Sequence, residues 1–237
     1  MQSVLVTGGS GYIGSHTSLV LLENGYEVYV YDSNINSSHK SLNNVRSVFL
    51  KNNKIKKNKL HYIKGDIRDE SSLDRLFKVA KDKGQPIKNV IHFAGLKYVS
   101  DSIVNSLEYW DVNVKGTINL IEVMKKNNCN TIVFSSSASV YGNSINTLIN
   151  EKSKVQPINP YGKTKAKVES FLTDIFNKSS DIWKIAILRY FNPIGAHPSG
   201  TIGEDPKGFN NNLFPRICEI AFHKNGKLQI YGDDWPT

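Results

Sequence analysis

The sequence predicts a doubly wound α/β domain, in which a parallel β-sheet is covered by helices on both faces. Short β-branched runs alternate with amphipathic segments over residues 1–190, and a glycine cluster separates the first strand from the first helix. A chain of 237 residues is long enough for one such domain. From residue 191 onward the chain becomes rich in Gly, Pro and Asn, so we predict that 191–237 begins a second, smaller domain.

The glycine cluster lies between a strand at residues 3–6 and an amphipathic segment at residues 17–23. Within it, Gly8, Gly11 and Gly14 recur every three residues. Such glycines permit a tight turn, the approach of a pyrophosphate to the backbone, and close packing of the helix on the strand. Because a helix N-terminus attracts phosphate, the pattern favours a Rossmann-type dinucleotide site over a glycine turn that binds no ligand.

The other elements follow from hydrophobic periodicity and turn residues. A second strand covers residues 27–31, and Asp32 at its end has about the spacing expected of an acid that binds the adenosine ribose. We predict further strands at 60–64, 89–93, 131–134 and 183–188, and helices at 40–50, 71–81, 106–127 and 161–177. Near the end of the chain we expect a helix at 212–223 and a short strand at 227–230.

Composition narrows the class of protein. The hydrophobic fraction of 39% is ordinary for a globular domain, and no apolar run is as long as a membrane span. The first strand begins almost at Met1, which leaves no room for a secretory signal. Two cysteines, Cys129 and Cys218, are too few for a disulfide framework, so we expect a cytoplasmic protein without a membrane partner.

The net charge of +9 raises the question of nucleic-acid binding. The segment Lys51–Lys59 holds five lysines and no acid, and without it the net charge falls to +4. A short Lys/Asn segment between two elements is typical of a solvated surface insertion. We favour that interpretation and expect no nucleic-acid partner. The alternative is nonspecific contact with a polyanion, which would depend on salt.

Polar or small residues follow several of the predicted strands, where ligands of doubly wound sheets bind. Besides Asp32, these positions hold Asp66 and Ile67, the pair Ala94 and Gly95 followed by Lys97, and Ser135, Ser136 and Ser137. Asp66 is placed to bond an adenine amino group, although it has an equal chance of being only a turn residue at a strand end. The serines have the same turn-forming alternative.

Tyr161 and Lys165 are four residues apart on a predicted helix and therefore share a face. Of the eleven tyrosines, only Tyr161 has a lysine at this offset. A free tyrosine has a pKa of about 10. To act as a base near neutral pH its pKa must fall by roughly three units, which corresponds to about 4 kcal/mol. A neighbouring ammonium group and a cationic nicotinamide ring both lower it. The spacing alone can arise by chance, but the dinucleotide fold and the serine cluster ending at Ser137 favour a functional pair.

The six histidines have no metal-ligand spacing, so we predict no metal site. His92 lies in a strand with a buried pattern, and we interpret it as a core or near-site residue rather than a catalyst. Neither a nucleophile elbow nor a metal-binding cluster occurs in the sequence.

Three motifs together resemble the extended short-chain dehydrogenase/reductase family: Gly8-x-x-Gly11-x-x-Gly14, Ser135-Ser136-Ser137 and Tyr161-x-x-x-Lys165. Longer segments are similar to the UDP-glucose 4-epimerases within that family, namely residues 4–16, 93–97, 134–142, 188–197, 211–215 and 231–237. The resemblance spans nearly the whole chain apart from Lys51–Lys59. It implies NAD-dependent epimerisation at C4 of a UDP-hexose, such as UDP-galactose or UDP-glucose, through a transient 4-keto sugar.

The resemblance also implies roles for individual residues. Tyr161 would take the proton from the 4-hydroxyl, Ser137 would bond the 4-oxygen, and Lys165 would hold the nicotinamide ribose and lower the pKa of Tyr161. The NAD site would comprise Gly8, Gly11, Tyr12, Ile13, Gly14, Asp32, Asn36, Ser37, Asp66, Ile67, Phe93, Ala94, Gly95, Lys97, Asn113, Tyr161, Lys165 and Phe191. The UDP-sugar would contact Ser137, Tyr161, Asn192, Asn212 and Leu213.

Three further expectations follow from the resemblance. Members of the family form homodimers through two helices, which match residues 106–127 and 161–177 here. They also extend beyond residue 237, so 191–237 would be only part of the substrate-binding domain. The missing part supplies an arginine for the diphosphate and the residues that choose between sugars. Related sugar-nucleotide 4,6-dehydratases carry an acidic pair where this chain has Ala138-Ser139, which favours epimerisation over dehydration.

Two other functions stay open at this point. The chain could be a dinucleotide-binding sensor that kept the fold and lost turnover, or another NAD-dependent enzyme acting on a different sugar nucleotide. Intact Ser137, Tyr161 and Lys165 argue against the sensor, because a sensor does not need the three together.

Overall fold

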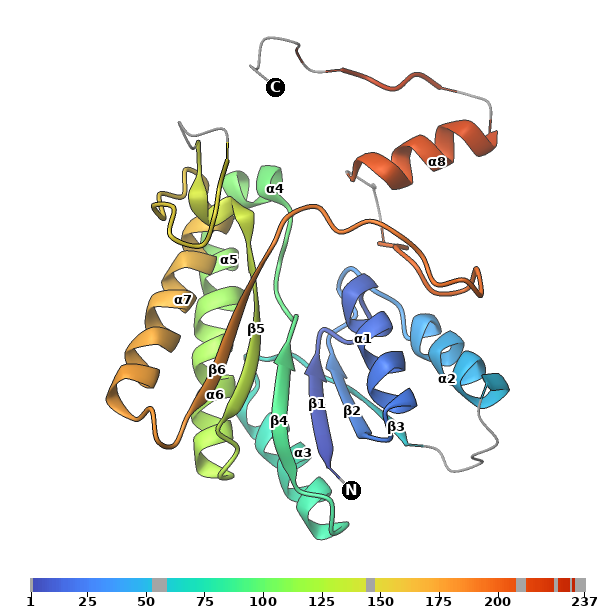
Figure 1. Ribbon diagram of the computed structural model, residues 1–237. Helices are drawn as coiled ribbons and strands as arrows, with labels where there is room; N and C mark the ends of the chain where they lie inside the picture. Colours follow the sequence, from blue (N-terminus) through green and yellow to red (C-terminus); the bar gives the residue numbers. More distant parts are fainter. Residues whose placement is uncertain are drawn as a thin grey trace.

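The sheet of the computed structural model has six parallel strands in the order β3-β2-β1-β4-β5-β6. The structure describes residues 2–52, 59–143, 148–207, 212–223, 226–230 and 232. The strands are β1 (Ser3–Thr7), β2 (Glu27–Asp32), β3 (Leu60–Lys64), β4 (Ile87–His92), β5 (Thr131–Ser137) and β6 (Lys184–Tyr190). The chain begins in the middle of the sheet, runs outward to β3, and then returns to β4 on the other side of β1 (Figure 1). The order reverses between β1 and β4, which is where such sheets bind ligands.

Helices cover both faces of the sheet, as the alternating pattern predicts (Figure 1). The helical elements before β6 are α1 (Tyr12–Glu23), α2 (Lys40–Asn52), α3 (Glu70–Asp82), α4 (Val99–Val104), α5 (Ser106–Tyr109), η1 (Trp110–Lys115), α6 (Gly116–Lys126), η2 (Ala138–Tyr141) and α7 (Pro160–Lys178). After β6 comes α8 (Leu213–His223). The predicted strands up to β6 and the predicted helices are therefore confirmed, with boundaries that differ by a few residues.

Two hydrophobic cores lie on opposite faces of the sheet. Val4 and Val6 of β1 pack with residues of α1 and α2, whereas Leu5 packs with residues of α3, α6 and α7. Successive side chains of a strand point to opposite faces, so one strand supplies both cores. All five residues of β1 are buried, as expected for a central parallel strand that is covered on both sides.

The predicted long helix at 106–127 forms, but not as one regular α-helix. A six-residue π-helical segment, η1, joins α5 to α6, and Asn113 lies within it. In a π-helix each turn holds an extra residue, which changes the direction of the side chains on that turn. The short helices α4 and η2 were not predicted from the sequence.

The predicted strand at 227–230 is wrong, because these residues form neither helix nor strand. A strand needs a neighbour that supplies its ladder of hydrogen bonds. No described strand lies beside this segment, since the sheet ends at β6. In the lysine-rich segment, positions 53–58 lie outside the described residues. Lys59 is buried, which differs from a fully solvated insertion.

No helix in the described ranges combines the length and apolar character that a membrane crossing requires. Across those same ranges, no group of His, Cys, Asp or Glu side chains is arranged to hold a metal ion.

Candidate functional site

A cleft of about 750 Å³ runs along the carboxyl ends of the strands, at the point where the strand order reverses. Its walls come from the glycine turn, the ends of β2 to β5, the start of α7 and the chain after β6. The cleft brings together Gly8, Gly11, Tyr12, Ile13, Gly14, Asp32, Asn36, Ser37, Asp66, Ile67, Phe93, Ala94, Gly95, Lys97, Ser137, Tyr161, Lys165, Phe191, Asn192, Asn212 and Leu213. Of the site residues predicted from the sequence, only Asn113 does not line it.

The glycine turn leaves no space for side chains at two of its positions. Gly8 has a φ of +69°, a conformation that favours glycine, and a Cβ there would lie 2.6 Å from the Ala94 nitrogen. A Cβ on Gly14 would lie 2.4 Å from the Gly8 oxygen. Gly11 begins α1 without a side-chain cap, and the first turn of α1 has no acidic residue. The turn therefore presents backbone and a helix N-terminus to the cleft, which suits an anion.

The carboxylate of Asp32 is held in a fixed orientation at the end of β2. It is buried, and one oxygen accepts the backbone N–H of Ser10 at 2.9 Å. The other accepts the N–H of Asn34 at 2.8 Å and the hydroxyl of Ser37 at 3.0 Å. A carboxylate has about four acceptor positions, so capacity for a further donor remains. Ser37 therefore acts on Asp32 directly.

Asp66 is already engaged by a neighbouring arginine. Arg68 donates from Nε to one Asp66 oxygen at 3.0 Å and from a terminal nitrogen to the other at 2.6 Å. Hydrogen bonds from Arg68 lower the pKa of Asp66 and keep it ionised. Arg68 also pairs with Asp111 of η1 at 2.9 Å. The expected contact of Asp66 with an adenine amino group would have to share this carboxylate with Arg68.

Asn113 lies behind the cleft and holds the loop after β4. Its side chain accepts the N–H of Leu96 at 2.8 Å and donates to the Leu96 carbonyl at 3.0 Å. It also donates to the hydroxyl of Thr164 on α7 at 3.2 Å. The π-helical turn directs this amide toward the β4 loop, so Asn113 joins the loop to α7.

The core histidine of β4 joins the same network. His92 contacts Thr7 of β1 at 2.6 Å and Thr117 of α6 at 2.8 Å, and Thr117 donates to the Asn113 carbonyl. Burial lowers the pKa of His92 to about 3, so its ring is neutral. His92 is thus a buried structural residue near the site, as the sequence suggests.

Tyr161 and Lys165 lie on the same face of α7 and meet the end of β5 in the cleft. The ammonium nitrogen of Lys165 lies 5.9 Å from the centre of the Tyr161 ring and donates to the Ser135 carbonyl at 2.8 Å. Tyr161 shares a hydrogen bond with Ser137. Asn159 caps α7 by accepting the N–H of Gly162 at 2.7 Å, which fixes the first turn on which Tyr161 stands.

Burial disfavours the charged form of both residues. It lowers the pKa of Lys165 from 10.5 to about 8 and raises the pKa of Tyr161, against the effect of Ser137. The protein groups alone therefore do not lower the pKa of the phenol, which differs from the expectation for a base. Glu169 cannot neutralise Lys165 fully, because it is paired with Arg189 at 2.7 Å.

One acid in the cleft was missed by reasoning from the sequence. Glu204 pairs with Lys97 at 3.1 Å and accepts a hydrogen bond from Asn212, and its side chain is only 7% exposed. Nothing in the local sequence indicates it, because Glu204 stands in a loop about a hundred residues from Lys97. Its position depends on where the chain turns after β6.

The chain is similar in sequence to known proteins along its whole length. Residues 5–236 match the family described as GDP-mannose 4,6 dehydratase. A bifunctional UDP-glucose 4-epimerase and UDP-xylose 4-epimerase of Pisum sativum is 46% identical over 236 residues, which are 100% of this chain and 65% of that protein. A UDP-glucose 4-epimerase of Bacillus subtilis is 44% identical, with coverage of 100% and 66%. The chain thus spans slightly less than two thirds of the length of these relatives.

The fold is also similar to solved structures of UDP-glucose 4-epimerases. A UDP-glucose 4-epimerase from Bifidobacterium longum, in complex with NAD+ and UDP, is 42% identical with a TM-score of 0.89. The alignment covers 100% of this chain and 67% of that one. A second, from Stenotrophomonas maltophila, contains NAD and formylated UDP-arabinopyranose and is 38% identical with a TM-score of 0.90 over 100% of this chain and 67% of that one.

Proposed function

We propose that the whole protein carries out NAD-dependent epimerisation at C4 of a UDP-hexose. The chain belongs to the GDP-mannose 4,6 dehydratase family. Within that family it is of the UDP-glucose 4-epimerase type, an extended short-chain dehydrogenase/reductase. The observation that carries this proposal is the meeting of Ser137, Tyr161 and Lys165 at one end of a cleft whose other end is a glycine turn. A dinucleotide that spans the cleft would bring its redox ring to these three residues.

The chemistry of the cleft fits NAD. Backbone at Gly8 and Gly14 leaves no space for side chains, and the start of α1 would receive the pyrophosphate. Asp32 has capacity to accept from a ribose hydroxyl. We also assign to the cofactor the other predicted residues of the cleft: Gly11, Tyr12, Ile13, Asn36, Ser37, Asp66, Ile67, Phe93, Ala94, Gly95, Lys97 and Phe191. Asn113 would support this site through the Leu96 backbone.

The redox chemistry belongs to NAD, which when bound would accept a hydride from C4 of the sugar and return it to the opposite face. Tyr161 takes the proton of the 4-hydroxyl and later returns it, because its phenol lines the cleft beside Ser137. Ser137 hydrogen-bonds the 4-oxygen and stays in contact with Tyr161. The sugar turns over between the two transfers, so the opposite face of C4 would receive the hydride while the 4-oxygen stays within reach of Tyr161.

Lys165 supplies the positive charge that Tyr161 needs. Its ammonium group has three donors and uses one on the Ser135 carbonyl, so two are free for ribose hydroxyls of the cofactor. With those acceptors in place the ammonium form is favoured, and the charge lowers the pKa of Tyr161. The raised pKa of the phenol in the protein alone is thus corrected by the ligand.

The UDP-sugar is bound by Asn192, Asn212 and Leu213, which reach the cleft from the chain after β6. We regard residues 191–237 as part of a substrate-binding domain that the rest of the protein completes. Dehydration is disfavoured, since η2 has Ala138 and Ser139 directly after Ser137 and so offers no carboxyl group for a second proton transfer.

Conversion of UDP-galactose to UDP-glucose by the full-length protein tests this function. We expect conversion without added reductant, with nicotinamide that co-purifies in near-stoichiometric amount. Tyr161→Phe should retain the cofactor and lose about 10³-fold in kcat. A folded protein that takes up no NAD at millimolar concentration would refute the proposal. NAD uptake without turnover would favour the sensor, and turnover of another UDP-sugar alone would favour the related enzyme.

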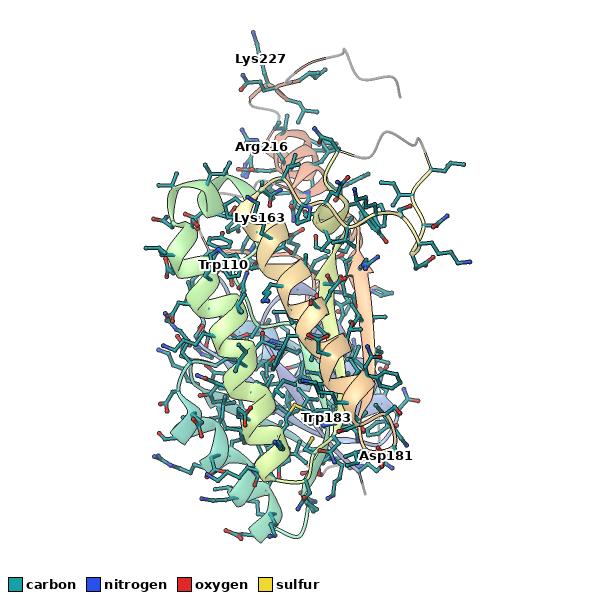
Figure 2. The ribbon with its side chains drawn as sticks, turned by 90° about the vertical axis from the view of Figure 1, so that its left-hand side faces the viewer. Trp110, Lys163, Asp181, Trp183, Arg216 and Lys227 are labelled. Carbon is teal, nitrogen blue, oxygen red and sulfur yellow. The ribbon has the colours of Figure 1, made fainter. Side chains whose placement is uncertain are left out.

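We further propose a cytoplasmic homodimer that pairs through residues 106–127 and 161–177. Figure 2 looks onto the face where α5 to α6 and α7 lie side by side, with Trp110 on it. Val104 and Leu107 near this face are 82% and 85% exposed, which is unusual for large apolar side chains. Leu107→Arg should give a monomer in light scattering, and an unchanged mass would contradict this interface.

A further inference from the structure

The chain after β6 crosses over the cleft to the opposite side of the sheet. Residues 192–207 run from the end of β6, above the carboxyl ends of the strands, to α1 and α2 (Figure 1). Asn192, Ile194 and Glu204 of this segment line the cleft from above. The segment therefore forms a wall opposite the sheet, and we name it the strap.

The strap is anchored on the glycine-turn side by backbone acceptors. Tyr12 of α1 donates to the Gly195 carbonyl at 2.5 Å, and Asn44 of α2 donates to the Thr201 carbonyl at 2.7 Å. Lys207 donates from its backbone to Asn36 at 3.0 Å and from its ammonium group to the Asn34 carbonyl at 2.7 Å. The Lys207 contacts join the strap to the loop that follows Asp32, and the other two join it to α1 and α2.

One apolar side chain adds to these hydrogen bonds. Ile202 is 2% exposed and packs in the core formed by β1, β2, α1 and α2. Apart from Ile202 and the Glu204 side chain, which is 7% exposed, the strap residues are exposed or half-buried. Within the cleft, Glu204 pairs with Lys97 at 3.1 Å. The strap is thus held by Ile202, the Glu204–Lys97 ion pair and a few hydrogen bonds, an arrangement that can open without disturbing the sheet.

We propose that the strap retains the dinucleotide, and that Ile202 and Asn44 are the anchors that set how fast the cofactor enters and leaves. This inference rests on the proposed function. A dinucleotide that reaches from the glycine turn to Lys165 lies beneath residues that line the cleft from the strap. Because the strap is continuous with β6 at one end and anchored at α1 and α2 at the other, lifting of the anchored part would let the ligand pass.

The rates of NAD binding test the proposal, measured by stopped-flow fluorescence and by exchange against labelled NAD. Asn44→Ala removes one hydrogen bond to the strap and should raise the dissociation rate about threefold to tenfold. Ile202→Ala should raise it at least about tenfold. The matched control is Asn43→Ala, an exposed position on the same helix, which should match the parent.

The NAD association rate distinguishes two cases. In one the strap opens to admit the ligand, and in the other it is a fixed wall that only contacts the ligand. Removing an anchor should raise the association rate together with the dissociation rate, so that affinity changes less than either rate. Hydrogen exchange at the Lys207 amide should also become faster in the variants without NAD, since that amide is bonded to Asn36. Unchanged NAD rates, or faster release with unchanged association, would overturn the proposal. A parent protein that binds no NAD would instead refute the proposed function.

Discussion

The two ends of the cleft hold charged groups in opposite conditions. At the glycine turn, Asp32 receives three protein donors and is held in place before any ligand arrives. At the start of α7, Lys165 is just as buried but makes one hydrogen bond, and burial lowers its pKa to about 8. The first end is organised by the protein alone, whereas the second leaves a charge for which the ligand must supply partners. Recognition and chemistry therefore place different demands on the same sheet edge.

Replacing Lys165 should give the largest effect, a change in how the unfolding free energy of the protein without ligand depends on pH. The folded-state pKa of Lys165 is lowered from 10.5 to about 8, so the unfolded chain binds more protons between these values and stability rises with pH across that window. The parent should gain about 3 kcal/mol of unfolding free energy relative to Lys165→Met between pH 8 and 10.5. Denaturant unfolding at a series of pH values measures this difference.

Lys163 provides the matched control for that experiment. It lies on the same helix, is exposed, and is labelled in Figure 2. Lys163→Met should leave the pH dependence of the parent unchanged. If Lys165→Met follows the same curve as the parent, the ammonium group is not stressed by burial and the contrast between the two ends is wrong.

A substitution of Asp32, at the glycine-turn end of the cleft, should change NAD binding by less free energy than Lys165→Met changes unfolding. Asp32→Asn keeps one acceptor but removes the charge, so a ribose hydroxyl loses a charge-assisted hydrogen bond, which contributes about 1.5–3 kcal/mol. We expect NAD affinity to fall about tenfold or more in isothermal titration, with the fold retained by circular dichroism. An affinity within twofold of the parent would show that this carboxylate serves only the loop between Ser10 and Ser37.

The smallest effect on NAD affinity is expected for Ser37, which also lies at the glycine-turn end of the cleft. Ser37→Ala removes one of the three donors to Asp32 and leaves the backbone donors of Ser10 and Asn34. The loss should be about 1 kcal/mol, seen as about a fivefold weaker NAD affinity. An effect as large as that of Asp32→Asn would mean that contact of Ser37 with the cofactor contributes more than its hydrogen bond to the carboxylate.

Local motifs carried most of the prediction of the site. Gly8 and Gly14 were predicted because the turn they form is specified within seven residues, and Tyr161 and Lys165 because one helical turn places them on one face. The pairing of Lys97 with Glu204 was not predictable, since it joins residues about a hundred positions apart. The pairing of Arg68 with Asp66 is local, but it was not predicted either, because it leaves no hydrophobic periodicity in the sequence.

For secondary structure too, elements with a local sequence pattern were predicted, whereas those that depend on distant contacts were not. The strands up to β6 follow from periodicity, because each run predicted as a strand has a neighbouring strand in the sheet. The segment 227–230 has a similar pattern but forms no strand, because a ladder needs a partner and none is described beside it. The π-helical turn at Asn113 also depends on contacts with Leu96 and Thr164, which lie in other elements.

The sequence by itself determined the order of strands and helices, the glycine turn, and the residue types that meet at the strand ends. These features depend on interactions over a few residues, for which chain order is sufficient. Only the tertiary structure decided that the chain after β6 returns over the cleft, that Asn113 acts from behind it, and that burial opposes the charges of Tyr161 and Lys165. The physical reason is that desolvation and long-range hydrogen bonds depend on what the rest of the fold packs around a group.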